Sequence, residues 1–278
     1  MRKYLLLTIL VLFTVCLFAQ PANAIVEKDP MELLNHLYAP KGELPLRDLI
    51  ADADLYAYVK EHPYSPDSML TNIYKFRIFY TAPNKLRIDQ VNTNKTVPSV
   101  VLGAFEVVIR DGKTVFIYVP YGDMPVKMDL DKPSPSIYLP FYIQKYPTYN
   151  NFKYVYLGQE KEGDKIIDVV GIINPKEDYA VNMTKLWIDS EKWVPAKLEY
   201  TKYVDPKKKG DTYTKRVTYT DVRQIRDGRY WPFKIKIEEL NKDTKDKFEF
   251  ESTLIYKDVI INTDLDPDLF APMKKYLK

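Results

Sequence analysis

Hydrophobic and polar residues alternate along most of the chain from about residue 48 onward. In the segment 74–80, Tyr74, Phe76 and Ile78 fall on one side, and Lys75 and Arg77 fall on the other. A period of two is that of a β-strand with one buried face, whereas a helix requires a period near 3.6. The pattern predicts a mainly β protein with about ten or eleven strands.

The predicted strands are separated by short polar turns. Asp111-Gly112 and Asp227-Gly228 are hairpin signals, and charged loops separate other strands. Parallel strands would need long crossover connections, which do not fit into these gaps, so the sheet is predicted to be antiparallel. An antiparallel sheet of this length curls, and it could close as a barrel, fold into a sandwich or stay open as a half-barrel.

Few segments are predicted to cover the apolar face of this sheet. They are an amphipathic helix near 29–40, an apolar proline-bounded segment at 138–149, and a C-terminal segment from Asp266 in which Asp266 and Pro267 form a helix start. These pieces are small for so wide a face. Because the covering segments are smaller than the apolar face, part of this face is predicted to bind a hydrophobic ligand.

The N-terminus has the features of a secretory signal. Arg2 and Lys3 precede the apolar run 5–18, and Ala22-Asn23-Ala24 supplies a small-residue cleavage pattern. The prediction is a cleaved signal peptide at 1–24, followed by one domain at 25–278. The alternative is an uncleaved N-terminal anchor.

The composition excludes several classes of site. The only cysteine is Cys16, inside the apolar run, so the exported chain would have neither a disulfide nor a thiolate. Removing residues 1–24 takes away Arg2 and Lys3 and lowers the formal net charge from +3 to +1, which argues against nucleic-acid binding. The two histidines, His36 and His62, lack the spacing of a zinc site.

No sequence motif indicates catalysis. There is no G-x-S-x-G elbow, and the aspartates Asp264, Asp266 and Asp268 are better explained by helix capping than by calcium binding. The chain is therefore predicted to have no catalytic site, metal or cofactor. A hydrolase with two carboxylates brought together by the fold remains an alternative.

Several motifs resemble the LolA/LolB superfamily, in its outer-membrane lipoprotein-sorting branch. They are the segment 82–89, which contains Leu86-Arg87, the segment 110–120, which ends in Tyr118-x-Pro120, and the segments 186–200 and 266–272. The resemblance spans about residues 30 to 273. It implies an eleven-stranded antiparallel sheet that forms an open half-barrel under a helical lid. Carriers of the family commonly have an arginine before the proline at the position of Ala82.

The resemblance implies a non-covalent carrier rather than an enzyme. The predicted function is to bind the acyl chains of lipoproteins or lipids in the periplasm, as a monomer, with possible inner- and outer-membrane partner proteins. Burial of hydrocarbon would provide the affinity, at about 0.8 kcal/mol per CH₂ group. The alternative is an envelope-stress sensor or interaction module of the same fold that signals to a membrane partner.

The predicted site is the apolar face together with the segments that cover it. The predicted lid residues are Leu34, Leu37, Phe141, Tyr142 and Ile143. The predicted ligand-binding residues are Tyr74, Phe76, Ile78, Leu86, Ile88, Phe105, Val107, Ile109, Val126, Met128, Leu198, Tyr200, Phe233, Ile235, Phe248 and Phe250.

Overall fold

A computed structural model describes residues 27–39, 45–59, 70–91, 105–119, 124–129, 153–173, 181–205, 208–240 and 248–273. The predicted signal peptide at 1–24 and the predicted covering segment at 138–149 lie outside these residues. No helix in the described ranges is long and apolar enough to cross a membrane.

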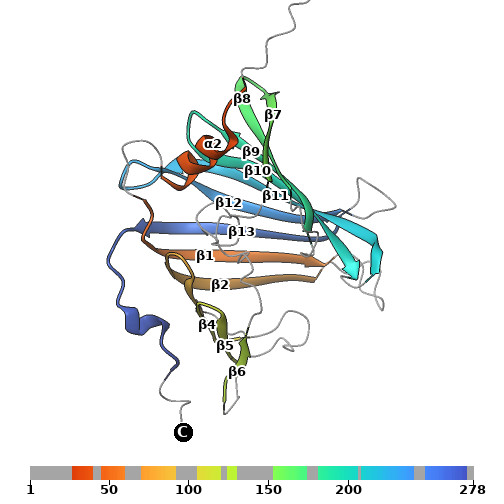
Figure 1. Ribbon diagram of the computed structural model, residues 1–278. Helices are drawn as coiled ribbons and strands as arrows, with labels where there is room; N and C mark the ends of the chain where they lie inside the picture. Colours follow the sequence, from red (N-terminus) through yellow and green to blue (C-terminus); the bar gives the residue numbers. More distant parts are fainter. Residues whose placement is uncertain are drawn as a thin grey trace, which may run out of the picture.

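One antiparallel sheet accounts for most of the described structure (Figure 1). Its strands are β1 (Asp48–Val59), β2 (Leu70–Thr81), β3 (Lys85–Gln90), β4 (Val107–Asp111), β5 (Thr114–Tyr118), β6 (Val126–Asp129), β7 (Lys153–Glu162), β8 (Lys165–Ile173), β9 (Val181–Asp189), β10 (Val194–Asp205), β11 (Lys208–Gln224), β12 (Tyr230–Leu240) and β13 (Phe248–Ile261). The described residues also contain two helical elements, α2 (Pro30–Tyr38) and the short 3-10 helix η3 (Pro267–Phe270).

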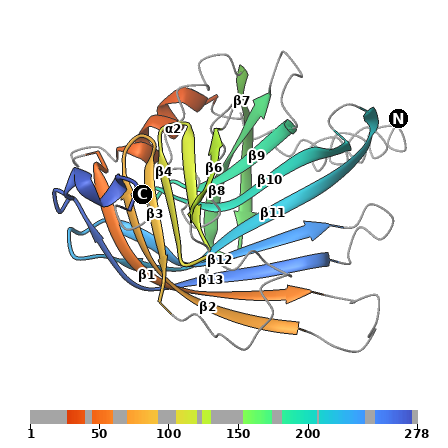
Figure 2. The same cartoon turned by 90° about the horizontal axis from the view of Figure 1, so that it is seen from below.

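The strand order is β6-β5-β4-β3-β2-β1-β13-β12-β11-β10-β9-β8-β7. Strands that are neighbours in the sheet are also neighbours in sequence, except for the pair β1 and β13. The sheet therefore consists of two meanders, β1 to β6 and β7 to β13, which are joined by the pairing of β1 with β13. The end strands β6 and β7 do not pair, and the sheet is strongly curved without closing into a barrel (Figure 2). The predicted open antiparallel half-barrel is confirmed.

The sheet of the described residues has thirteen strands, more than the eleven that the resemblance implies. Strand β8 shows why alternation is a poor guide to the number of strands. Ile167 and Val169 are buried on one of its faces, and Val170 and Ile172 are buried on the other. A strand covered on both sides reads as a continuous apolar run and does not show a period of two.

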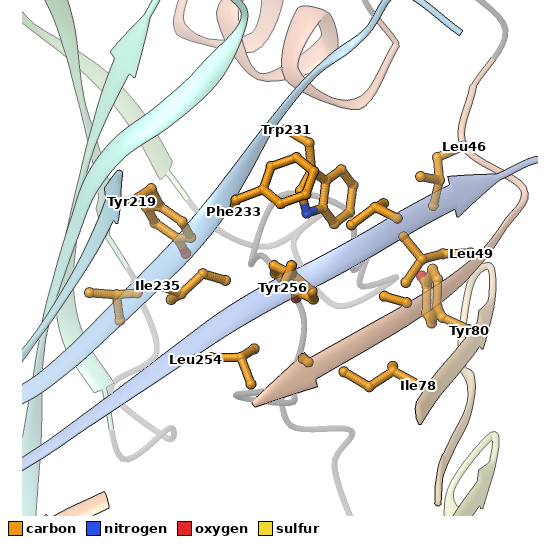
Figure 3. Close-up of a cluster of buried hydrophobic side chains, with 14 of the residues drawn as sticks. Leu46, Leu49, Ile78, Tyr80, Tyr219, Trp231, Phe233, Ile235, Leu254 and Tyr256 are labelled. Atoms are coloured by element: carbon orange, nitrogen blue, oxygen red, sulfur yellow. The ribbon is translucent and has the colours of Figure 1, made fainter. Parts of the chain in front are cut away.

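Buried hydrophobic side chains of the described residues form one large cluster and two smaller ones. The larger cluster extends over the sheet from β3 to β8 and includes Leu33, Leu34 and Leu37 of α2. We call the face of the sheet with this cluster the inner face, and the opposite face the outer face. Figure 3 shows part of the cluster, where side chains of β1, β2, β11, β12 and β13 lie next to one another on this face.

The C-terminal segment covers part of the outer face. Helix η3 contacts β3 and β4, and Met273 packs against Val107, Ile109 and Tyr118. The predicted helix start is confirmed, because the Asp266 side chain caps η3 by accepting a hydrogen bond from the Asp268 backbone N–H. Figure 1 shows this segment on the side of the sheet where β4 and β5 lie, away from α2.

Candidate functional site

Most of the predicted binding residues that the structure describes belong to the large inner cluster. Tyr74 and Phe105 are partly buried and pack against this cluster. The ring of Phe76 stacks with both of them, with centroid distances of 6.0 Å to Tyr74 and 5.7 Å to Phe105. The buried members of this cluster are Phe76, Ile78, Leu86, Ile88, Leu198, Phe233 and Ile235. These side chains pack against other side chains of the protein, and so they form its own core.

Val107 and Ile109 were predicted on the inner face, and the strand register places them on the outer one. Ile109 is opposite Arg87, whereas Val108 is opposite Ile88 of the inner cluster. Directly paired residues of antiparallel strands project on the same face. The prediction was wrong because Val107, Val108 and Ile109 are all apolar, so that alternation alone could not decide which of them faces inward.

The alternation of inward- and outward-facing side chains shifts just before β4. Phe105 packs on the inner cluster, but residues 105 and 106 precede the strand, and Glu106 lies in a bend. The chain therefore does not continue the alternation from Phe105 to Val107. This bend explains why one residue of the predicted set faces inward and the next faces outward.

Val126 and Met128 lie on the inner face, as predicted, but they are exposed. Val126 is opposite Ile117 and Met128 is opposite Val115, on the same face as Val108. Their exposed fractions are 50% and 42%, whereas Val115 is buried. Apolar side chains of the inner face thus continue through Val108 and Ile117 to the edge strand β6, where they are open to solvent. The neighbouring row of this face contains the buried Arg110, opposite Leu86 and Val115.

The remaining predicted residues fall outside what the structure describes in detail. Tyr200 lies on β10, and Phe248 and Phe250 lie on β13, but the positions of these three side chains are not described. The predicted lid residues Phe141, Tyr142 and Ile143 are also outside the described residues. Their part in a site therefore stays a prediction.

Helix α2 is the described element that covers the inner face. Leu34 and Leu37, which were predicted to belong to a lid, are 6% and 3% exposed and pack in the large cluster with Leu33. Asp29 begins the helix by accepting a hydrogen bond from the Met31 backbone N–H at 2.9 Å. The helix contacts β7, close to the open edge of the sheet (Figure 1).

A buried carboxylate lies beside the N-terminus of this helix, and the sequence reading missed it. Asp168 of β8 is 1% exposed and accepts hydrogen bonds from Tyr156 at 2.8 Å, from Gln159 at 3.0 Å and from Ser190. Lys28 donates to both carboxylate oxygens, at 2.9 and 2.8 Å. The signal available in the sequence was a single charge within the apolar run of β8, where an unpaired carboxylate would be costly.

The pKa values of this cluster follow from its burial and contacts. Burial alone would raise the pKa of the Asp168 carboxyl, but hydrogen bonds from Lys28, Ser190, Tyr156 and Gln159 together lower it below its ordinary value. The pKa of Tyr156 is raised by burial and by its hydrogen bond to Asp168, and burial raises the pKa of Tyr154 to about 12. Asp168 is therefore an anion at neutral pH, and both tyrosines are neutral.

We expect Asp168→Asn to lower the free energy of unfolding by about 2 kcal/mol at neutral pH, because hydrogen bonds to charged groups contribute about that much. The pKa of Asp168 is lower in the folded protein, so its contribution is complete above the unfolded pKa of about 3.9. The contribution is lost as the pH falls below that value. Urea unfolding of both proteins at about pH 7, 5 and 3 should show the difference shrinking only at the lowest pH. A difference in the free energy of unfolding that is the same at all three pH values would contradict the role of Asp168 as a stabilising anion.

A second contact joins α2 to the sheet. The His36 ring lies 4.5 Å from the ring of Trp193, in the turn between β9 and β10. Trp193 has a positive φ of 52°, which is unusual for a residue with a large side chain.

Within the described residues, no group of three or more His, Cys, Asp or Glu side chains could hold a metal ion.

Comparison with solved structures shows which fold this sheet has. A LolA superfamily protein of Nitrosomonas europaea superposes with a TM-score of 0.59 at 15% identity, covering 88% of this chain and 98% of its own. A putative outer membrane lipoprotein-sorting protein domain of Vibrio parahaemolyticus has the same TM-score at 14% identity, covering 86% of this chain and 95% of its own. The chain has the fold of the LolA superfamily.

Two further comparisons add to this result. A DUF1329 family protein of Desulfovibrio piger also superposes on the LolA-like sheet, with a TM-score of 0.59 at 12% identity, covering 88% of this chain and 98% of its own. A family model described as that of an uncharacterized protein matches residues 143–278. No protein with a curated description matches the sequence.

One position of the LolA-like fold differs from the pattern that the resemblance implies. Ala82, in the place of the arginine of the carriers, packs partly buried against the large cluster, and its backbone N–H donates to the Arg47 carbonyl at 2.8 Å. A methyl group cannot form the polar contacts that an arginine makes. Any polar contact that holds a cover on this LolA-like sheet must come from other residues.

Proposed function

We propose that the protein is a periplasmic carrier or binding protein for the acyl chains of lipids or lipidated proteins. The mature chain, residues 25–278, would act as one domain and bind its ligand on the inner face without covalent chemistry. The fold supports this proposal, and one similar structure is named as an outer membrane lipoprotein-sorting domain. The N-terminal sequence supports the location.

The observation that carries the proposal is the exposure of Val126 and Met128 on the inner face. The same face is tightly packed from β3 to β8, but its apolar surface continues to β6, with Val115 and Ile117 beside these two residues. Apolar side chains that extend outward from a core provide a surface on which hydrocarbon can be buried. Each CH₂ group buried there would contribute about 0.8 kcal/mol, so a chain of ordinary length would need no charged anchor.

We expect the double variant Val126→Asp, Met128→Asp to bind an acyl chain at least about tenfold more weakly, because two carboxylates would have to lose water against hydrocarbon. The measurement is titration of the mature protein with dansyl-labelled undecanoic acid, followed by fluorescence. The wild type should bind the probe.

The matched control is Leu157→Asp. Leu157 has a similar exposed fraction, 44%, but lies on β7 at the other end of the sheet. The control should bind like the wild type. The proposal fails if the wild type does not bind the probe, or if the control loses as much affinity as the double variant.

A further inference from the structure

Arg110 is a buried cation in an apolar part of the inner face. It is 5% exposed on β4, next to the hairpin turn that leads into β5. The strand register places it directly opposite Leu86 of β3 and Val115 of β5, both of which are buried. Burying a charge among apolar side chains is costly, and an apolar residue would pack at this position at lower cost. Packing alone therefore does not account for an arginine here.

The other charged residues of the described strands β2 to β6 lie on the outer face. The register pairs them with one another or with outer-face residues, and some form ion pairs there, such as Arg87 with Asp89 at 2.7 Å. They are Lys75, Arg77, Lys85, Arg87, Asp89, Asp111, Lys127 and Asp129. On these strands, the charge that the inner face carries is thus the positive charge of Arg110.

The exposed apolar residues of the inner face lie close to this charge. Val115 lies between Arg110 and Met128 in one row of the sheet, and the adjacent row contains Ile117 and Val126. Neighbouring strands are about 4.8 Å apart, so Met128 is about 10 Å from Arg110 across the sheet. An acyl chain of ordinary length spans this distance. A ligand whose hydrocarbon lies on Val126 and Met128 can therefore place its head group at the guanidinium.

A guanidinium group is suited to carboxylate and phosphate ligands. Its N–H donors form a planar fork that matches two oxygens of such an anion. Arg110 also interacts with other groups of the protein. Because a guanidinium has several donors, it can keep such an interaction and bind an anion at the same time. Burial shields the group from water, which strengthens its attraction for an anion.

We propose that Arg110 binds the head group of the ligand and makes the site selective for acyl chains that end in an anion, either a carboxylate or a phosphate. This selectivity rests on the function proposed above, because it concerns the same site. Burial of hydrocarbon provides the affinity. The contact with Arg110 decides which head groups are accepted and which end of the chain lies at β4.

Two probes that differ only in charge test this selectivity, dansyl-labelled undecanoic acid and its methyl ester. We expect the mature wild type to bind the acid at least about tenfold more tightly than the ester, because hydrogen bonds between charged groups are stronger than neutral ones. Arg110→Met should bind the acid more weakly, bind the ester like the wild type, and so lose the preference. Arg110→Lys keeps the charge and should keep part of the preference.

The matched control is Lys127→Met. Lys127 lies on β6 between Val126 and Met128, but it projects on the outer face, opposite Phe116. The variant removes the same charge and should keep the preference for the acid. Replacing a buried charge with an apolar residue of similar size is often neutral for stability, so Arg110→Met should fold. If it does not, Arg110→Gln is to be measured and must meet the same criterion.

The possible results separate the role of Arg110 from the proposed function. Equal binding of acid and ester by the wild type overturns the selectivity but leaves acyl binding intact, and so does an unchanged preference in Arg110→Met. A loss of preference in Lys127→Met as large as that in Arg110→Met also overturns it, because net charge would then be the cause. If the wild type binds neither probe, the proposed function fails, and the selectivity fails with it.

Competition identifies the source of the anion. Dodecanoate and dodecyl phosphate should both displace the bound acid probe from the wild type at lower concentration than dodecanol, which is neutral. Stronger displacement by dodecanoate indicates a free fatty acid, and stronger displacement by dodecyl phosphate indicates a lipid phosphate. Displacement by dodecanol at the same concentration as by both anions contradicts a role for the head-group charge.

Discussion

Trp231→Ala is expected to lower the free energy of unfolding by about 3 to 5 kcal/mol, the usual cost of deleting a large aromatic side chain from a core. Trp231 is fully buried on β12, in the middle of the sheet, and its ring meets that of Tyr256 edge to face at 5.8 Å. Figure 3 shows both rings between β12 and β13, with Leu49 and Phe233 nearby. Strand β12 is paired with β11 on one side and with β13 on the other, so these strands cannot move together to fill the space, and the cavity would persist.

Equilibrium unfolding in urea, followed by far-ultraviolet circular dichroism, measures this effect. Lys234→Ala is the control, because Lys234 lies on the same strand with an exposed side chain, and its loss should change stability by less than about 0.5 kcal/mol. A loss below about 1 kcal/mol for Trp231→Ala would contradict the assignment of a tightly packed inner core.

Phe270→Ala is expected to release the C-terminal segment from the outer face, at a cost of about 3 kcal/mol. Phe270 is 1% exposed on η3, which contacts β3 and β4. Arg87 donates to the Leu269 carbonyl at 3.2 Å, and the Met273 backbone N–H donates to the Tyr118 hydroxyl at 2.8 Å. Without the Phe270 ring these polar contacts would be more accessible to water and less persistent.

Hydrogen–deuterium exchange locates the effect of Phe270→Ala. Amides of β4 and β5 should exchange faster, because Val107, Ile109 and Tyr118 lose part of their cover. Amides of β9 and β10, on the other side of the sheet, should not change. Leu269→Ala, at a half-buried neighbour, is the control and should have the smaller effect. Equal exchange of β4 and β5 in wild type and Phe270→Ala would contradict the proposed role.

The turn that leads into this segment depends on a buried aspartate. Asp48 is 4% exposed and accepts hydrogen bonds from the backbone N–H groups of Thr263, at 2.6 Å, and Asp264, at 3.1 Å. Asn262 and Asp264 have positive φ angles of 55° and 57°, which allow the chain to turn sharply after β13. The carboxylate of Asp48 thus compensates for a backbone conformation that these residues adopt less readily.

Local sequence patterns predicted the class of the fold. Alternation over residues 74–80 and at Leu86 and Ile88 indicated strands with one buried face, and both segments are strands of the inner core. Asp266 marked a helix start that the structure contains, and the amphipathic segment near 29–40 contains α2. These predictions succeed because alternation, capping and turn chemistry depend on neighbours along the chain, which a sequence displays directly.

The sequence by itself thus determined a curled antiparallel sheet, the strands around 74–80 and 86–88, and the helix start at Asp266. Tertiary structure alone decided which face Val107 and Ile109 occupy, because three successive apolar residues satisfy either register and the pairing of β3 with β4 selects one. It alone decided that Lys28 meets Asp168, since 140 positions separate them in the chain. Contacts between distant segments depend on how the whole sheet curves, and no local pattern contains that information.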